Sequence, residues 1–114
     1  MGEEGRSAAL EELRRQIQEL DRDLLRLFCR RQALALQVLE AKGPGAPVRV
    51  PEVEAKKMAA LPALLADLSQ TGDWPASLGR EEVLAWLLAD SQKFLATLMA
   101  LSRERQEAQR NVKF

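Results

Sequence analysis

The hydrophobic residues in the first third of the chain follow a helical period. In the stretch 8–42, AALEELRRQIQELDRDLLRLFCRRQALALQVLEAK, they recur at Leu10, Leu13, Ile17, Leu20, Leu24, Leu27, Leu34, Val38 and Ala41. This spacing predicts a helix that packs along its whole length. At ~1.5 Å per residue it would be roughly 52 Å long, beyond the roughly 26–30 Å across a compact domain of this size. We therefore expect something beyond its own chain to cover it.

Local stop and start signals divide the rest of the chain. The segment GPGAP ends the first helix after Lys42, with Gly43 in the C′ position. Pro51 opens a second helix, which Pro62 should kink or break, with a helix near 51–61 and a shorter continuation near 63–69. The apolar face of this helix consists of Met58, Leu61, Leu65 and Leu68.

A third helix is expected after the loop 69–79, from Arg80 to about Gln109, with Ser77 or Gly79 as its cap. Its inward stripe is Leu84, Leu87, Leu88, Ser91, Leu95, Leu98 and Ser102. No stretch shows the alternation of a strand. We predict an all-α fold in which residues 1–114 form one domain of three helices, the first and third long. Residues 1–7 should fray, with Ser7 as the cap of the first helix.

The charge balance excludes several classes of partner. Lys plus Arg and Asp plus Glu are equal, at 17 each. No overall field therefore attracts nucleic acid or an anionic membrane. The sequence also has no run of 18 apolar residues and no charged-then-apolar signal pattern near its start. We expect a soluble protein of the cytoplasm, without nucleic-acid or membrane partners.

The composition also limits the chemistry. There is no His and one Cys among the 114 residues. A His general base, a catalytic triad and a zinc site are therefore excluded, and we expect neither a metal nor a cofactor. Cys29 is expected to be a small buried hydrophobe of the first helix. Arg, Lys, carboxylates and hydroxyls remain for any chemistry.

Three polar residues stand where packing alone would favour apolar ones. Arg31 interrupts the stripe of the first helix, and Lys42 lies about three turns further along the same face, roughly 16 Å away. Ser91 interrupts the stripe of the third helix. A snorkelling Arg, a Lys at a helix C-terminus and a Ser that eases close packing explain each residue singly. Together they suggest a site for a small dianion, because a buried cation is costly without an anion.

The same stretches resemble a known family. LRRQIQELDRDLLRLFCRRQALALQVLEAK is similar to the first helix of the all-helical, type II chorismate mutases, PVRVPEVEAKKM to the start of their second helix, and LLADS to a segment of their third. The resemblance covers about residues 10–105. It implies an intertwined homodimer with two active sites. Each site is built mostly from one chain, with one Arg from the other.

By this resemblance, Arg14 is the Arg donated across the dimer, and it lies roughly 25 Å from Arg31 along the helix. Arg31 binds a substrate carboxylate, and Lys42 contacts a carboxylate and the ether oxygen. Glu54 lies near the substrate hydroxyl, and Ser91 is the third-helix Ser. The implied reaction is the pericyclic rearrangement of chorismate to prephenate in the shikimate pathway of aromatic amino acid biosynthesis. It needs no nucleophile, which suits a chain without His.

Three positions depart from the family pattern. Val53 replaces a second-helix Arg, and Val50 replaces a common acidic residue. Leu95 lines the substrate site in place of a Gln or Glu that hydrogen-bonds the ether oxygen. Loss of one such donor typically costs about 3–4 kcal/mol of transition-state stabilisation. Lys56 or Lys57, one turn beyond Val53, would restore a cation.

Three functions fit this pattern. The first is a chorismate mutase or a weakened version of one. The second is a relative acting on another enolpyruvyl dicarboxylate, such as an isochorismate pyruvate lyase. The third is a non-catalytic helical dimer that senses an aromatic-pathway metabolite or regulates a partner enzyme. Turnover of chorismate, release of pyruvate from isochorismate, and thermal stabilisation without turnover distinguish them.

Overall fold

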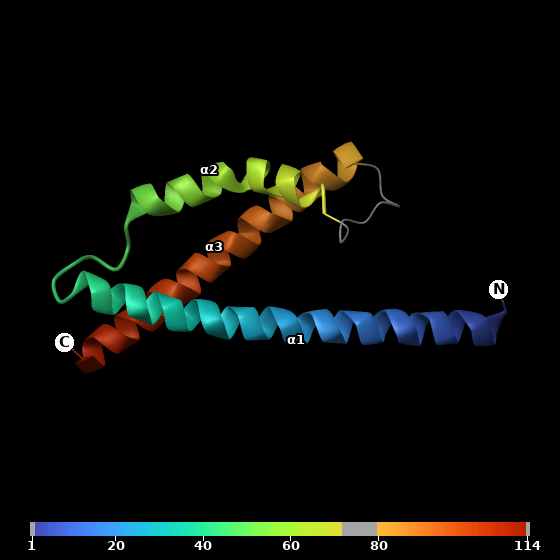
Figure 1. Cartoon of the computed structure of the whole chain (residues 1–114), viewed down its shortest axis with the longest axis horizontal. Coiled ribbons are helices and arrows are strands. Elements are labelled where there is room, and N and C mark those ends of the chain that lie inside the picture. Colours follow the sequence, from blue (N-terminus) through green and yellow to red (C-terminus); the bar gives the residue numbers. More distant parts are fainter. Residues whose placement is uncertain (1, 72–79, 114) are drawn as a thin grey trace. The chain divides into compact units, whose positions relative to one another are not determined.

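The computed structural model describes residues 2–71 and 80–113, which form three helices (Figure 1). These are α1 (Glu3–Lys42), α2 (Pro51–Leu68) and α3 (Arg80–Lys113). No strand occurs in the described ranges, and the predicted all-α class is confirmed. The chain divides into two compact units, residues 1–41 and 42–114. The first contains α1, and the second contains α2 and α3.

α1 begins at Glu3, earlier than the predicted Ala8. Glu3 and Glu4 occupy its first turn, where negative charge favours the helix N-terminus. Residues 3–7 are thus part of the helix, and Ser7 lies within it instead of capping it. The predicted end is confirmed, because α1 stops at Lys42 and Gly43 has a φ of +78°. Only glycine adopts this left-handed conformation at little cost.

The apolar stripe of α1 is largely uncovered within its own unit. Its first six members are between 47% and 60% exposed, namely Leu10, Leu13, Ile17, Leu20, Leu24 and Leu27. Cys29 is also exposed, so its predicted burial is wrong for the single chain. No second helix belongs to the unit of α1. The stripe thus has the pattern of a packed face without a packing partner in its unit.

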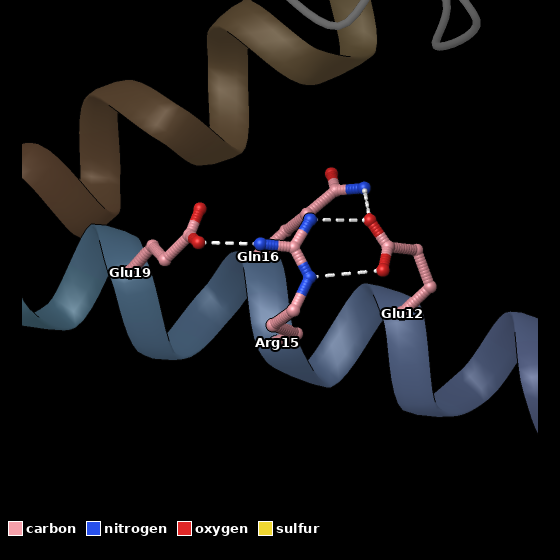
Figure 2. A network of polar contacts seen from close by, with 4 residues as sticks. All are labelled: Glu12, Arg15, Gln16 and Glu19. Carbon is pink, nitrogen blue, oxygen red and sulfur yellow. Dashed lines mark hydrogen bonds and ion pairs between the residues drawn. The ribbon is translucent and has the colours of Figure 1, made fainter.

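An ionic network stabilises the solvent side of α1 (Figure 2). Arg15 Nε donates to Glu12 Oε2 at 2.9 Å, and Arg15 also pairs with Glu19 one turn later. Gln16 Nε2 donates to Glu12 Oε1 at 3.2 Å. The hydrogen bond from Arg15, with a smaller one from Gln16, lowers the pKa of Glu12 from 4.5 to about 2. The side chains of Glu12, Arg15 and Glu19 are more than half exposed, so water and salt screen the network.

α2 runs unbroken from Pro51 to Leu68 with Pro62 inside it, so the predicted break at Pro62 is wrong. A proline removes one helical hydrogen bond and crowds the carbonyl one turn earlier. Pro62 is exposed, whereas Leu61 and Leu65 are buried. The packing of α2 against α3, in which Leu61 and Leu65 are buried, compensates for the missing hydrogen bond.

α3 runs antiparallel to α2, and the two helices converge where α2 ends and α3 begins (Figure 1). Its predicted stripe is confirmed as a continuous half-buried or buried face, formed by Leu84, Leu87, Leu88, Ser91, Leu95, Leu98 and Ser102. Val83 and Met99 add fully buried contacts. The helix continues to Lys113, past the predicted end at Gln109. The predicted caps Ser77 and Gly79 lie outside the described residues.

Within the described residues, the segment Val83–Val112 of α3 is long and apolar enough to cross a membrane by length and composition alone. The core helix of a soluble bundle meets the same criteria. Asp90 and Lys93 lie in its apolar half, where a hydrocarbon environment would penalise both charges. The segment therefore gives no independent argument for membrane insertion.

The Glu12 network predicts a pH-dependent contribution to stability. The folded-state pKa of Glu12 lies below its ordinary value, so the stabilisation is complete above pH 4.5 and is lost as the pH falls towards 2. Glu12→Gln should lower the thermal midpoint at pH 7 by at most about 4 °C, since the pairs are exposed. The midpoints of wild type and variant should converge between pH 4.5 and 2.

Glu11→Gln is the matched control, because Glu11 is an exposed neighbour of Glu12 on the same helix. Circular dichroism melts at several pH values measure both variants. A difference in thermal midpoint between wild type and Glu12→Gln that persists unchanged at pH 2 would show that ionised Glu12 is not the source of the pH dependence.

Candidate functional site

The first turn of α2 places Glu54 opposite α3. Pro51 occupies the first helical position, and Val50 before it is extended, with a φ of −122°. The carbonyl of Val50 accepts the backbone N–H of Val53 at 3.0 Å and that of Glu54 at 3.2 Å. Glu54 then precedes the inward residues of α2 by one and two turns, since Met58 is half-buried and Leu61 is buried. Its carboxylate therefore starts on the face that packs against α3.

Two guanidinium groups surround the Glu54 carboxylate. Arg103 of α3 donates from Nη1 to Glu54 Oε2 at 2.5 Å. Arg49 Nε lies 3.7 Å from the other oxygen, Oε1. The side chains of Glu54 and Arg103 are 19% and 29% exposed, whereas that of Arg49 is 65% exposed. The Glu54–Arg103 pair is thus the shielded contact, and Arg49 adds a solvent-exposed charge.

The sequence reasoning did not identify Arg103 as a residue of the site. It directly follows Ser102, the last residue of the predicted α3 stripe. The signal that could have found it is the position of Glu54 on the inward face of α2. An acid there requires a cation or a donor from the helix that covers it.

Long cationic side chains also hold the connection between α1 and α2. Lys42 Nζ donates to the carbonyl of Pro47 at 3.0 Å and to that of Val48 at 3.4 Å. Arg110 of α3 donates from Nη2 to the carbonyl of Ala46, while its Nε is buried without a hydrogen-bond partner in the described structure. Val48 itself is buried. The connection is therefore held by Lys42 at the start of the second unit and by Arg110 near its end.

An open groove of about 510 Å³ lies beside this connection. Its lining consists of Val48, Ala100, Arg103, Glu104 and Glu107. The two Glu residues outweigh the charge of Arg103, so the groove disfavours a dicarboxylate. We do not assign it as the substrate site.

The second unit contains four of the predicted site residues: Lys42, Glu54, Ser91 and Leu95. Lys42 bonds to the connection, and Glu54 bonds to Arg103, as described above. Ser91 and Leu95 are half-buried and lie one turn apart on α3, as predicted. Leu95 offers no hydrogen-bond donor on this face.

The unit of α1 contains the other two predicted residues, Arg14 and Arg31. Arg14 is exposed. Arg31 is half-buried, less than its place in the stripe predicts. The unbroken course of α1 supports the calculated separation of the two, roughly 25 Å along the axis.

The positions that depart from the family pattern lie at the start of α2. Val50 is half-buried, and Val53 is 50% exposed. Lys56 and Lys57 are exposed, and Lys57 follows Val53 by one turn on the same side of the helix. Among the described residues, no group of three or more His, Cys, Asp or Glu side chains could hold a metal ion.

Comparison with known proteins identifies the family. A search of curated proteins and a search of solved structures found no match. The family model for chorismate mutase type II matches residues 13–107, which include α2 and most of α1 and α3. The matched range also contains the predicted site residues, from Arg14 to Leu95. On this match, and with the helical architecture expected of it, the chain belongs to the type II chorismate mutase family.

Proposed function

We propose that this protein is a chorismate mutase-like isomerase that converts chorismate to prephenate, with an activity weakened at one position of the site. The observation that carries the proposal is the family match over residues 13–107. Five polar residues add support because they stand where the family resemblance requires them, namely Arg14, Arg31, Lys42, Glu54 and Ser91.

The proposed residues act by binding and electrostatics. Arg31 and Lys42 would bind the two carboxylates of the compact substrate conformer, and Arg14 of a second chain would complete the cationic surroundings. Lys42 would also stabilise the negative charge that grows on the ether oxygen as the C–O bond breaks. Holding the reacting carbons together supplies the remaining acceleration. No proton transfer or covalent intermediate is needed.

Leu95 is the reason for proposing a weakened activity. A Gln, or a Glu in its protonated form, would donate a hydrogen bond to the ether oxygen from this position, and Leu cannot. The missing donor removes about 3 kcal/mol of transition-state stabilisation, which corresponds to a rate lower by about 100-fold. Substrate binding through the cations would persist, because it does not depend on this donor.

A second candidate is an enzyme for another enolpyruvyl dicarboxylate, such as an isochorismate pyruvate lyase. Apolar residues at Val50, Val53 and Leu95 favour it, since they change the ether side of the pocket while the cations remain. A third candidate is a non-catalytic dimer that binds an aromatic-pathway metabolite or regulates a partner enzyme. For all three candidate functions, we propose that the protein lies in the cytoplasm.

A turnover assay on the purified protein tests the proposal. Loss of chorismate with formation of prephenate supports the mutase. Pyruvate released from isochorismate supports the lyase, and stabilisation by a dicarboxylate transition-state mimic without any turnover supports the binding protein.

A homodimer is part of the proposal, because the stripe of α1 exposes about half of each of its first six apolar side chains. The thermal midpoint should therefore rise with protein concentration. Leu20→Glu should shift the protein towards monomer in analytical ultracentrifugation, since it places a charge in the stripe. Gln18→Glu, on an exposed position outside the stripe, should leave the dimer intact. A wild-type monomer at all concentrations would refute the dimer.

Arg31→Ala should abolish binding of a dicarboxylate transition-state mimic, because the mimic loses a charge-assisted hydrogen bond worth about 1.5–3 kcal/mol and a cation that opposes its own charge. Arg30→Ala is the matched control, since Arg30 is exposed and adjacent. Calorimetric titration measures the affinities, and circular dichroism confirms that the variants fold. An unfolded Arg31→Ala would identify Arg31 as a structural residue.

Subunit mixing tests whether the site is shared between chains. Arg14→Ala and Arg31→Ala should each be inactive as homodimers. A heterodimer of the two would contain one site with both arginines, so mixing should restore activity. Absence of recovery, despite verified exchange of subunits, would argue that each chain builds its site alone.

Leu95→Gln should raise kcat by up to about 100-fold if the missing donor recovers most of its usual ~3 kcal/mol. The Michaelis constant should change less, because the donor acts mainly in the transition state. Steady-state kinetics with chorismate measure both. Ala96→Gln is the control, since it introduces the same side chain at an exposed neighbouring position.

A pocket remade for another ligand predicts a different result for Leu95→Gln. The buried amide would then be unpaired, stability would fall by roughly 1–3 kcal/mol, and mutase activity would stay at background. Unchanged turnover together with unchanged stability would mean that Leu95 does not face the pocket.

A further inference from the structure

The contact between Arg103 and Glu54 joins residues that are 49 positions apart in sequence, on α3 and α2. It is the shortest of the contacts around Glu54, at 2.5 Å, and both side chains are mostly shielded from solvent. Exposed ion pairs of long side chains are weak and easily rearranged. This pair is held instead by two helices that pack against each other.

We propose that Arg103 is a positioning residue, which fixes the Glu54 carboxylate so that its second oxygen faces a substrate hydroxyl. The inference rests on the proposed function, in which Glu54 contacts the substrate. Arg103 itself would contact Glu54 and not the reacting atoms.

The two oxygens of Glu54 have different surroundings, which gives the carboxylate a defined orientation. Oε2 accepts the hydrogen bond from Arg103. Oε1 lies 3.7 Å from Arg49 Nε, which is an ion-pair distance and too long for a hydrogen bond. A carboxylate has about four acceptor positions, so Oε1 retains capacity for a hydroxyl donor.

Arg103 is better suited to this role than Arg49. The Arg49 side chain is 65% exposed, so solvent competes for its charge. Arg103 is 29% exposed, and its Nη1 reaches the carboxylate directly. A free Glu side chain samples several rotamers, and selecting one costs entropy when substrate binds. An Arg held on α3 would remove this cost before binding.

The experiment compares Arg103→Met with Arg105→Met in steady-state turnover of chorismate. Met retains an unbranched apolar stem but removes the charge and the donors. Arg105 is an exposed residue of the same helix and serves as the control. Arg103→Met should lower kcat by about 10-fold to 100-fold with a smaller change in KM, because misplacing a reacting-site group acts mainly on the transition state. Arg103→Lys should recover part of the loss, and Arg105→Met should match wild type.

A double-mutant cycle separates positioning from a merely structural role. In a Glu54→Gln background, Arg103→Met should cause no further loss of kcat, because the carboxylate that Arg103 positions is gone. Melting curves establish that each variant is folded at the assay temperature. If Arg103→Met does not fold, Arg103→Gln is judged by the same criteria, since it removes the charge but keeps an amide donor.

The outcomes distinguish the two proposals. A wild-type protein without turnover of chorismate overturns the proposed function, and the catalytic use of Glu54 with it. An active wild type whose folded Arg103 variants keep kcat within about twofold overturns the positioning role alone. If Arg103→Met lowers kcat equally in the wild-type and Glu54→Gln backgrounds, the positioning role is also overturned, because Arg103 would then act independently of the carboxylate.

Discussion

The apolar stripe of α1 is the constraint that dominates this protein. Complete burial of a Leu or Ile side chain stabilises a protein by about 1.5–3 kcal/mol relative to exposure. Six such side chains at the start of α1 remain about half exposed. The stabilisation that complete burial of these six side chains would add is comparable with the whole free energy of unfolding of a small domain, about 5–15 kcal/mol. A stable fold of this length therefore depends on covering the stripe, and the proposed dimer does so with a second copy of the same helix.

The second unit is stabilised differently, by buried apolar side chains of α2 and α3 and by charged side chains near the start of α2. Leu61, Leu65, Val83 and Met99 are among the buried residues of α2 and α3. Near the start of α2, Arg103 binds Glu54, and Arg110 and Lys42 bind carbonyls of the connection. Apolar contacts fix which faces meet but tolerate sliding, whereas a hydrogen-bonded charge pair requires a particular register. The polar contacts thus specify the geometry around two residues of the proposed site, Lys42 and Glu54.

The proposed site separates substrate binding from acceleration of the reaction. A cation that contacts only a carboxylate acts on substrate and transition state alike, whereas a group at the ether oxygen, such as Lys42 or a donor at position 95, acts mainly on the transition state. This chain retains the cations at Arg31 and Lys42 but has Leu95 at the donor position. Under the proposed function, such a combination would bind a dicarboxylate better than it converts one. It is consistent both with a slow mutase and with a pocket that has acquired another ligand.

The sequence by itself determined the elements, and the tertiary structure decided the contacts between them. Hydrophobic periodicity located three helices and the inward face of α3, and Gly43 marked the end of α1, because these features depend on residues close in sequence. The family resemblance placed the proposed site residues in the same local motifs. The continuity of α2 through Pro62 could not be foreseen, since it depends on Leu61 and Leu65 packing against another helix. The bond between Arg103 and Glu54 was also hidden, because no local pattern relates two residues 49 positions apart until their helices pack.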